Sequence, residues 1–379
     1  MAATSQTSGR TLLCVGNYDR NTGYAWRTIR QVWNQVAERL AKQGVRTLVV
    51  ERERGGGEGQ TAEGALLRLE CGWNDWDDLV EICRREQVDC CWLTDREILS
   101  RDYGRLRAAG VRSIVNHERT SGVRDVPTGL KRFVKGLLAR RSSWTADRYV
   151  AISDFVQRRL LESGRLPQSK VSRIYNAIDT VRWREPIDRK EVRSRLGLTD
   201  DRPLVVCTSR AQSYKGIGSY MEALHRISAQ RSLLAVHCGD GPELEFFRGR
   251  AREMSDDRIR LLGAREDYRD LVRAADLVVV PPHWAEAFGL TVVEAMAAGR
   301  PLVATSVGAI PELAEDGEQA LLVEAGNVEQ LNRAIVRLLD DRRLAGQLAA
   351  AAQRRAIEQF DFVRLASELE QLFLHELSR

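Results

Sequence analysis

Several features that would restrict the function of this chain are absent from its sequence. No apolar run approaches the roughly 20 residues that a membrane-spanning helix needs. The first ten residues contain no apolar segment, so we expect no secretory signal. The 5 histidines never occur in H-x-x-x-H spacing, which argues against a zinc site. The glycines of residues 52–60 lack G-x-G-x-x-G spacing, so they predict a surface loop and no Rossmann fingerprint.

The cysteine content and the net charge further restrict the class of protein. The 7 cysteines form no C-x-x-C pair, and their odd number favours buried, reduced thiols in a cytoplasmic protein. The net charge is only +5, and no basic repeat is interleaved with aromatic residues. These two features argue against a nucleic-acid partner and favour small acidic ligands or anionic surfaces.

The length and the hydrophobic pattern predict two domains of the α/β class. At 379 residues, with 43% hydrophobic residues, the chain is too long for one ordinary core. Short apolar segments alternate with helical patterns in both halves, which indicates two doubly wound Rossmann-like domains that face a cleft. The predicted strands are residues 11–16, 45–50, 88–93, 111–116, 149–152, 171–175, 204–208, 233–238, 259–262, 277–280, 302–305 and 320–323. The domains are expected over residues 1–185 and 186–360.

Residues 275–313 form the most informative segment. They predict a buried strand, a polar loop, a helix and a second strand, with Glu286 before the helix and Glu294 within it. A helix N-terminus attracts anions, and Gly289 would let the backbone approach one closely. Two carboxylates at the same place are suited to accept hydrogen bonds from hydroxyl groups, so the segment fits a nucleotide sugar. Alternatively, Thr291 and Glu294 form a capping box, and Glu286 is a solvated loop charge.

The run from Glu286 to Glu294, EAFGLTVVE, resembles the paired-glutamate signature of retaining glycosyltransferases of family 4, which have the GT-B fold. The resemblance implies that Glu294 holds the donor ribose and that Glu286 touches the transferred sugar. Ala287 and Ala309 stand where the family usually has glycine. The backbone amides implied to face the diphosphate and the sugar are those of Phe288, Gly289 and Leu290.

The resemblance extends to three other loops of the second half. Arg210 and Lys215 match the family's phosphate-binding cations, although by position alone both are solvated loop charges. Gly239 and Asp240 also match, and Asp240 could equally be a turn residue. Around Leu262, similar enzymes hold the base through backbone atoms.

In the first half, His117 is expected in a loop at the carboxyl end of a strand, where open sheets bind ligands. Spacing alone suggests a hydrogen-bonded loop residue, whereas the resemblance implies that His117 faces the sugar and the acceptor. Gly23 and Tyr24 are the acceptor-side candidates. The resemblance also implies that a C-terminal helix, residues 361–379, crosses back to the first domain.

Residues 131–148 are strongly basic, with apolar residues in between. The sequence favours a cationic helix packed by its apolar stripe, and the alternative is peripheral contact with anionic lipid.

Together these features predict a metal-independent glycosyltransferase without a cofactor, and the resemblance implies that it retains the anomeric configuration. It would move a sugar from a UDP- or GDP-linked donor to a hydroxyl acceptor such as a glycan, a lipid-linked sugar or a small metabolite. Alternatives are a silent carbohydrate-binding or scaffold protein and a nucleotide-sugar epimerase on the same fold.

Overall fold

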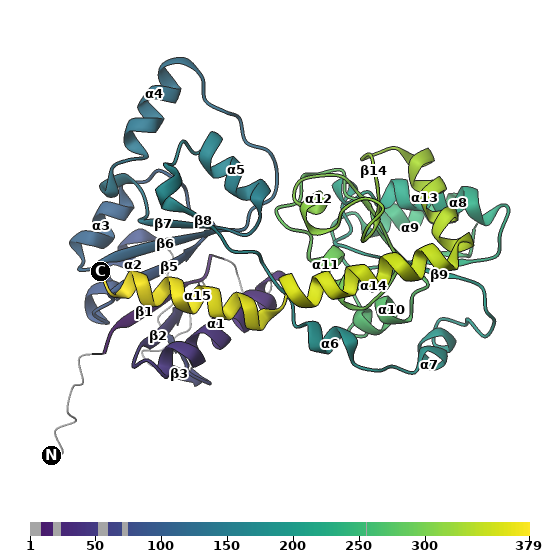
Figure 1. Ribbon diagram of the computed structural model, residues 1–379, viewed down its shortest axis with the longest axis horizontal. Coiled ribbons are helices and arrows are strands. Elements are labelled where there is room, and N and C mark those ends of the chain that lie inside the picture. Colours follow the sequence, from purple (N-terminus) through teal and green to yellow (C-terminus); the bar gives the residue numbers. More distant parts are fainter. Residues whose placement is uncertain (1–8, 18–23, 52–59, 70–74, 255) are drawn as a thin grey trace. The chain divides into compact units, whose positions relative to one another are not determined.

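The computed structural model describes residues 9–17, 24–51, 60–69, 75–254 and 256–379. It divides into two compact units (Figure 1). Unit 1 comprises Met1–Asn176 and Phe362–Arg379, and unit 2 comprises Ala177–Asp361. Among the described residues, no helix combines the length and the apolar character that crossing a membrane requires.

Unit 1 is built on an 8-stranded sheet in the order β3-β4-β2-β1-β5-β6-β7-β8. Its strands are β1 Thr11–Val15, β2 Arg46–Val50, β3 Gln60–Glu63, β4 Leu66–Leu69, β5 Cys90–Thr94, β6 Ser113–Glu118, β7 Arg148–Ala151 and β8 Val171–Arg173. Its helices are α1 Tyr24–Ala41, α2 Trp76–Arg85, α3 Asp102–Ala108, α4 Gly129–Leu138, α5 Asp154–Glu162 and α15 Phe362–Leu377, with short 3-10 helices at Ser142–Trp144 and Gln168–Lys170.

All pairings in this sheet are parallel except that of β3 with β4. The six strands predicted in this half are confirmed, and every residue of β1 and β5 is buried, as expected for central parallel strands. The sequence analysis missed the hairpin of β3 and β4 at the sheet edge. Its turn contains Gly64 at a φ of 65°, and the short, polar first strand carries no apolar alternation.

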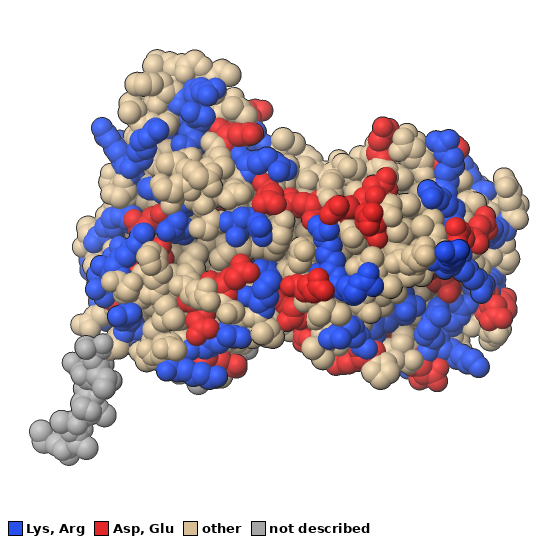
Figure 2. All heavy atoms as spheres, viewed as in Figure 1, with Lys and Arg blue, Asp and Glu red and all other residues tan. Residues whose placement is uncertain are grey.

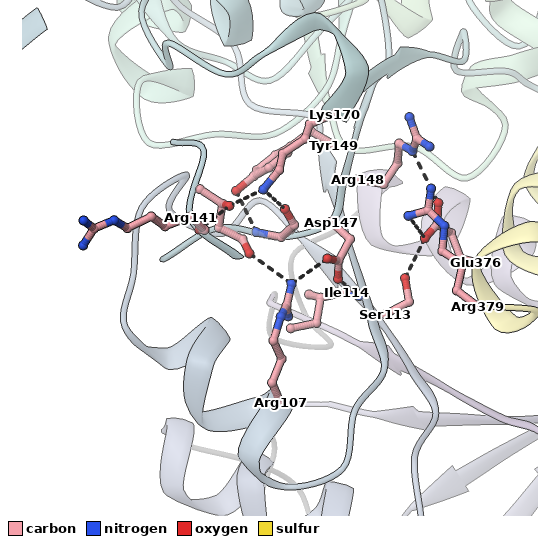
Figure 3. Close-up of polar contacts among 12 residues, drawn as sticks. Arg107, Ser113, Ile114, Arg141, Asp147, Arg148, Tyr149, Lys170, Glu376 and Arg379 are labelled. Atoms are coloured by element: carbon pink, nitrogen blue, oxygen red, sulfur yellow. Dashed lines mark hydrogen bonds and ion pairs between the residues drawn. The ribbon is translucent and has the colours of Figure 1, made fainter. Parts of the chain in front are cut away.

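Helix α15 belongs to unit 1 and runs beside α1 (Figure 1). The Phe373 ring packs on Trp92 of β5 with ring centroids 4.5 Å apart. The buried Glu376 carboxylate accepts a 2.7 Å hydrogen bond from Ser113 Oγ and is paired with Arg148 and Arg379 (Figure 3). A buried carboxylate needs such partners, so this ion pair ties the end of the chain to β6 and β7.

Unit 2 has a 6-stranded, fully parallel sheet in the order β11-β10-β9-β12-β13-β14. Its strands, all predicted, are β9 Leu204–Thr208, β10 Leu234–Cys238, β11 Ile259–Gly263, β12 Leu277–Val280, β13 Leu302–Thr305 and β14 Leu321–Val323. Its helices are α6 Thr180–Arg184, α7 Arg189–Ser194, α8 Ile217–Ser228, α9 Leu244–Glu253, α10 Tyr268–Ala274, α11 Leu290–Ala297, α12 Ile310–Leu313, α13 Val328–Asp340 and α14 Arg342–Gln359, with a 3-10 helix at Ser213–Lys215.

In this order the chain starts at β9, adds strands on one side, and then continues at β12 on the other side. The crevice outside the carboxyl ends of β9 and β12 is therefore the topological switch point, where doubly wound sheets bind ligands.

The division between the units falls earlier than the boundary expected at residues 185 and 186. Ile178 N donates a 2.9 Å hydrogen bond to Phe360 O, and the Thr180 hydroxyl donates to Asp361 Oδ2 at 2.5 Å. Because these bonds join the chain after Asn176 to the end of α14, residues 177–185 belong to unit 2.

Candidate functional site

Two loops of unit 2 meet at the switch point between β9 and β12. Lys215 follows β9, Glu286 follows β12, and Lys215 Nζ lies 2.6 Å from Glu286 Oε1. Both side chains are partly exposed, at 24% and 14%. The structure thus brings together a cation and a carboxylate that the sequence analysis selected separately.

The loop that carries Lys215 is held against β12 by a close backbone approach. Gly216 has a φ of 73°, and a Cβ atom there would lie 1.7 Å from Pro281 O, so only glycine fits. Tyr214 O also accepts a 2.8 Å hydrogen bond from His283 N. These contacts orient Lys215 toward the loop that contains Glu286.

Glu286 is held by the turn after β13. Ala309 N donates a 2.9 Å hydrogen bond to Glu286 O. Gly308 has a φ of 56°, and a Cβ atom there would lie 2.2 Å from the same oxygen. Nothing local in the sequence reveals this contact of Gly308 with a residue of another loop.

Helix α11 begins at Leu290, with Gly289 as its N-cap at a φ of 105° and no side-chain cap. The N-cap residue therefore offers no side-chain acceptor to the first backbone N–H groups of the helix, and a helix N-terminus of this kind suits an anion. The predicted capping box is wrong, because Thr291 lies inside the helix. Glu294 lies one turn further on, with only 3% of its surface exposed. The Phe288 ring is also buried and packs edge-on against Phe360, so only the backbone of Phe288 can face a ligand.

The remaining donor-side candidates follow β9, β10 and β11. Arg210 is exposed and forms no ion pair with any described residue. Gly239 lies against Ser209, where a Cβ atom would meet Ser209 O at 1.9 Å. Asp240 is exposed, and its Oδ1 accepts a 2.8 Å hydrogen bond from Gly241 N, so it is a turn residue in this structure. Leu262, near the end of β11, is half-buried.

The sequence analysis expected His117 in a loop. In the structure it lies within β6 of unit 1. The strand continues to Glu118 because His117 pairs with Thr94 on one side and Val150 on the other. The ring is buried and stacks on Trp92 with centroids 5.9 Å apart. Trp92 Nε1 donates to His117 Nδ1 at 3.3 Å, and Arg119 Nη2 lies 3.3 Å from the same nitrogen.

These contacts define the state of the His117 ring. With two donors at Nδ1, the proton is assigned to Nε2, a buried nitrogen that has no hydrogen-bond partner among the described residues. Burial, reinforced by the Arg119 charge, lowers the pKa of His117 well below its usual value of about 6.5. The ring is therefore neutral at pH 7 and offers a single N–H donor.

Gly23 lies outside the described residues, and Tyr24 begins α1 with a side chain that is also outside them.

The sequence analysis missed two buried residues, one in contact with a predicted site residue and one in contact with the chain neighbour of another. Trp92 orients His117, and nothing in a buried apolar strand distinguishes it. His237 in β10 is buried, and its Nε2 lies 3.1 Å from the hydroxyl of Ser209, the residue before Arg210. Burial lowers the pKa of His237 to about 4. Among the described residues, no group of three or more His, Cys, Asp or Glu side chains could hold a metal ion.

Comparison with known proteins is consistent with this geometry. Residues 29–182 match the family described as Glycosyltransferase Family 4, and residues 188–355 match Glycosyl transferases group 1. The chain is 34% identical over 200 residues to the lipopolysaccharide core biosynthesis mannosyltransferase LpsB of Rhizobium meliloti, covering 49% of this chain and 57% of LpsB. It is 31% identical over 258 residues to the alpha-D-kanosaminyltransferase of Streptomyces kanamyceticus, covering 65% and 66%. The matches thus span about half to two thirds of these relatives' own lengths.

Solved structures share the fold at low sequence identity. A glycosyltransferase of Rickettsia africae superposes with a TM-score of 0.79 at 18% identity, covering 97% of this chain and 99% of that one. The Anabaena protein HepE, solved in complex with UDP-glucose, has a TM-score of 0.72 at 20% identity, covering 96% and 99%. With both halves matched by family and the whole chain matched by fold, this protein belongs to the group 1 glycosyltransferases of family 4 and has the GT-B fold.

Proposed function

We propose that this protein is a retaining glycosyltransferase that uses a nucleotide-diphosphate sugar, UDP- or GDP-linked, without a metal ion. The observation that carries the proposal is the position of Lys215, Glu286 and the N-terminus of α11 at one switch point. A cation and a helix N-terminus suit the diphosphate, and the nearby carboxylate suits sugar hydroxyls.

The chemistry follows from the charges at this point. As the bond from the anomeric carbon to the diphosphate breaks, negative charge develops on the leaving oxygen, and Lys215, Arg210 and the α11 amides stabilise it. The acceptor hydroxyl then attacks from the same face. Its oxygen bonds to the anomeric carbon, and its proton passes to the departing phosphate. Glu286 is proposed to hold the transferred sugar, and Glu294 to hold the ribose.

On the acceptor side, we propose that His117 donates a hydrogen bond through Nε2–H to the sugar or the acceptor. The acceptor class is a hydroxyl compound: a glycan, a lipid-linked sugar or a small metabolite. Because His117 is neutral, its proposed role is to orient a hydroxyl and not to transfer a proton.

The test is a thermal-shift screen with UDP, GDP, ADP, TDP and their common sugars, repeated with a chelator. A ligand at about 100 times its Kd adds roughly 2.7 kcal/mol to the free energy of unfolding, which is readily visible. We expect UDP or GDP to raise the Tm equally with and without chelator. A response to no nucleotide would favour a silent carbohydrate-binding protein, and a response lost on chelation would overturn metal independence.

A further inference from the structure

Helix α4 exposes an apolar stripe to solvent. Leu130, Phe133, Val134 and Leu137 recur at intervals of three and four residues, so they share one helix face. All four are exposed, Leu130 at 78% and Phe133 at 65%. Val123 and Val126, in the segment just before α4, are exposed as well.

The buried residues of this segment lie on the side of the helix opposite to the stripe. The buried residues there are small, Gly136 within α4 and Ala139 just after it. An ordinary surface helix turns its apolar stripe inward, and the sequence analysis favoured that arrangement here. That prediction is wrong, because all four apolar residues of the stripe are exposed. Contiguous exposed apolar residues of this kind mark an interaction surface.

The residues around the stripe are cationic. Between Asp125 and Asp147 the sequence contains no acidic residue but five basic ones: Lys131, Arg132, Lys135, Arg140 and Arg141. Among the described residues, no ion pair is formed by Lys131, Arg132 or Arg141. Burial, together with the nearby charge of Arg124, lowers the pKa of Lys135, as expected where positive charges gather. Figure 2 shows blue Lys and Arg atoms among tan atoms over α4.

This combination decides which partner the surface fits. Two copies of the chain joined through this face would bring two sets of unpaired cations together, which is unfavourable. An anionic lipid surface offers a hydrophobic interior for the stripe and negative headgroups for the cations. We propose that α4 and residues 123–128 form a docking surface, called here the α4 surface, that inserts its apolar stripe into a leaflet containing anionic lipids.

The test is flotation of the full chain with vesicles, in the absence of nucleotide sugar and acceptor. One set of vesicles contains phosphatidylcholine alone, and the other contains phosphatidylcholine mixed with phosphatidylglycerol. We expect binding to the mixed vesicles, weaker binding to the neutral ones, and a loss of the difference as salt is raised.

Two pairs of variants assign the binding to the α4 surface. Phe133→Ser should weaken it roughly tenfold because an inserted aromatic ring is lost. The matched control is Phe246→Ser, which removes a Phe of similar exposure, 60%, from α9. The double variant Lys131→Glu and Arg132→Glu should weaken binding to anionic vesicles by at least about thirtyfold. Its control is Arg342→Glu with Arg343→Glu, two exposed arginines at the start of α14.

Three results would overturn the proposal. They are an absence of vesicle binding, equal binding by Phe133→Ser and Phe246→Ser, and a self-associated chain that becomes monomeric in Phe133→Ser. The last result would make this face an interface between copies of the chain. Nucleotide-induced thermal shifts, measured on the same variants, should be unchanged, so failure here is distinguishable from failure of the proposed transferase function.

Discussion

Lys215 Nζ and Glu286 Oε1 lie 2.6 Å apart, although the two residues are 71 positions apart in the sequence. They come from the loops after β9 and β12, the two strands that flank the switch point of unit 2. We expect a diphosphate that binds Lys215 to compete with Glu286 for the ammonium group. Binding of the donor would therefore release the carboxylate toward the sugar hydroxyls.

This competition predicts opposite effects of two substitutions on nucleotide affinity. Lys215→Ala should weaken binding of the nucleoside diphosphate about 10- to 100-fold, because a hydrogen bond between charged groups is worth about 1.5–3 kcal/mol. Glu286→Gln should leave that affinity unchanged or raise it, and should lower kcat. Isothermal titration calorimetry and initial rates measure the two quantities.

Lys190→Ala, at an exposed lysine of α7, is the control for charge loss in unit 2. Weaker nucleotide binding by Glu286→Gln would contradict the competition, and so would unchanged binding by Lys215→Ala.

A second prediction concerns Glu294. Because Gly289 is the N-cap of α11, Glu294 is not needed for a capping box. Glu294→Gln should weaken nucleotide binding with little change in Tm, since the amide has the same shape as the buried carboxyl. Thr291→Ala should also leave the Tm nearly unchanged, because Thr291 is not the N-cap. Thermal unfolding with and without nucleotide checks both. If Thr291→Ala lowered the free energy of unfolding by about 1 kcal/mol or more, this result would support the capping box.

Gly308 tests how Glu286 is held. Gly308→Ala introduces a Cβ atom 2.2 Å from Glu286 O, whereas Gly317→Ala, at a similar φ of 74°, meets nothing within 4 Å. Gly317→Ala should lower the free energy of unfolding by about 1 kcal/mol, the cost of a left-handed alanine. Gly308→Ala should lower the free energy of unfolding by clearly more than Gly317→Ala does, and it should also lower kcat. Equal costs in urea unfolding would show that the contact with Glu286 is unimportant.

Trp92 is expected to act on His117 through its indole N–H. Trp92→Phe keeps an aromatic ring beside His117 and Phe373 but removes the donor to Nδ1. Nitrogen NMR of the His117 ring should then show a mixture of tautomers in place of the Nε2–H form, and kcat should fall several-fold. If the His117 tautomer stays unchanged in Trp92→Phe, Arg119 alone is sufficient to fix the proton on Nε2.

His237 predicts a loss of stability in mild acid. Its pKa is about 4 in the folded protein and about 6.5 when unfolded, so between these values the unfolded chain binds more protons. The free energy of unfolding should therefore fall as pH drops from 6.5 to 4, on the order of 3 kcal/mol in total from this residue. His117 acts in the same direction because its pKa is also lowered.

Urea unfolding across this pH range provides the measurement. His237→Asn should flatten the slope of stability against pH, whereas His375→Asn, at an exposed position of α15, should not. Equal slopes in wild type and His237→Asn would contradict the assignment.

The local pattern was sufficient to identify the strands of both sheets, apart from one edge hairpin. Buried parallel strands are short apolar runs, and such runs are visible in the sequence. The helix that contains Glu294 and the loop before it were also predicted from the sequence, because glycine and proline residues mark the ends of both segments. The capping box of Thr291 and Glu294 was wrong because both Gly289 and Thr291 can cap a helix, and only backbone conformation distinguishes them.

What the sequence determined by itself was the alternation of strands and helices, and with it the doubly wound class of both units. It also supplied the residue types that a phosphate and sugar site requires. Only the tertiary structure decided which of these residues meet. The pairing of Lys215 with Glu286 depends on β9 and β12 being neighbours, and the burial of His117 depends on β6 lying between two strands. The exposure of the apolar stripe of α4 was likewise visible only in the structure. Such contacts join residues far apart in the chain, so no local pattern encodes them.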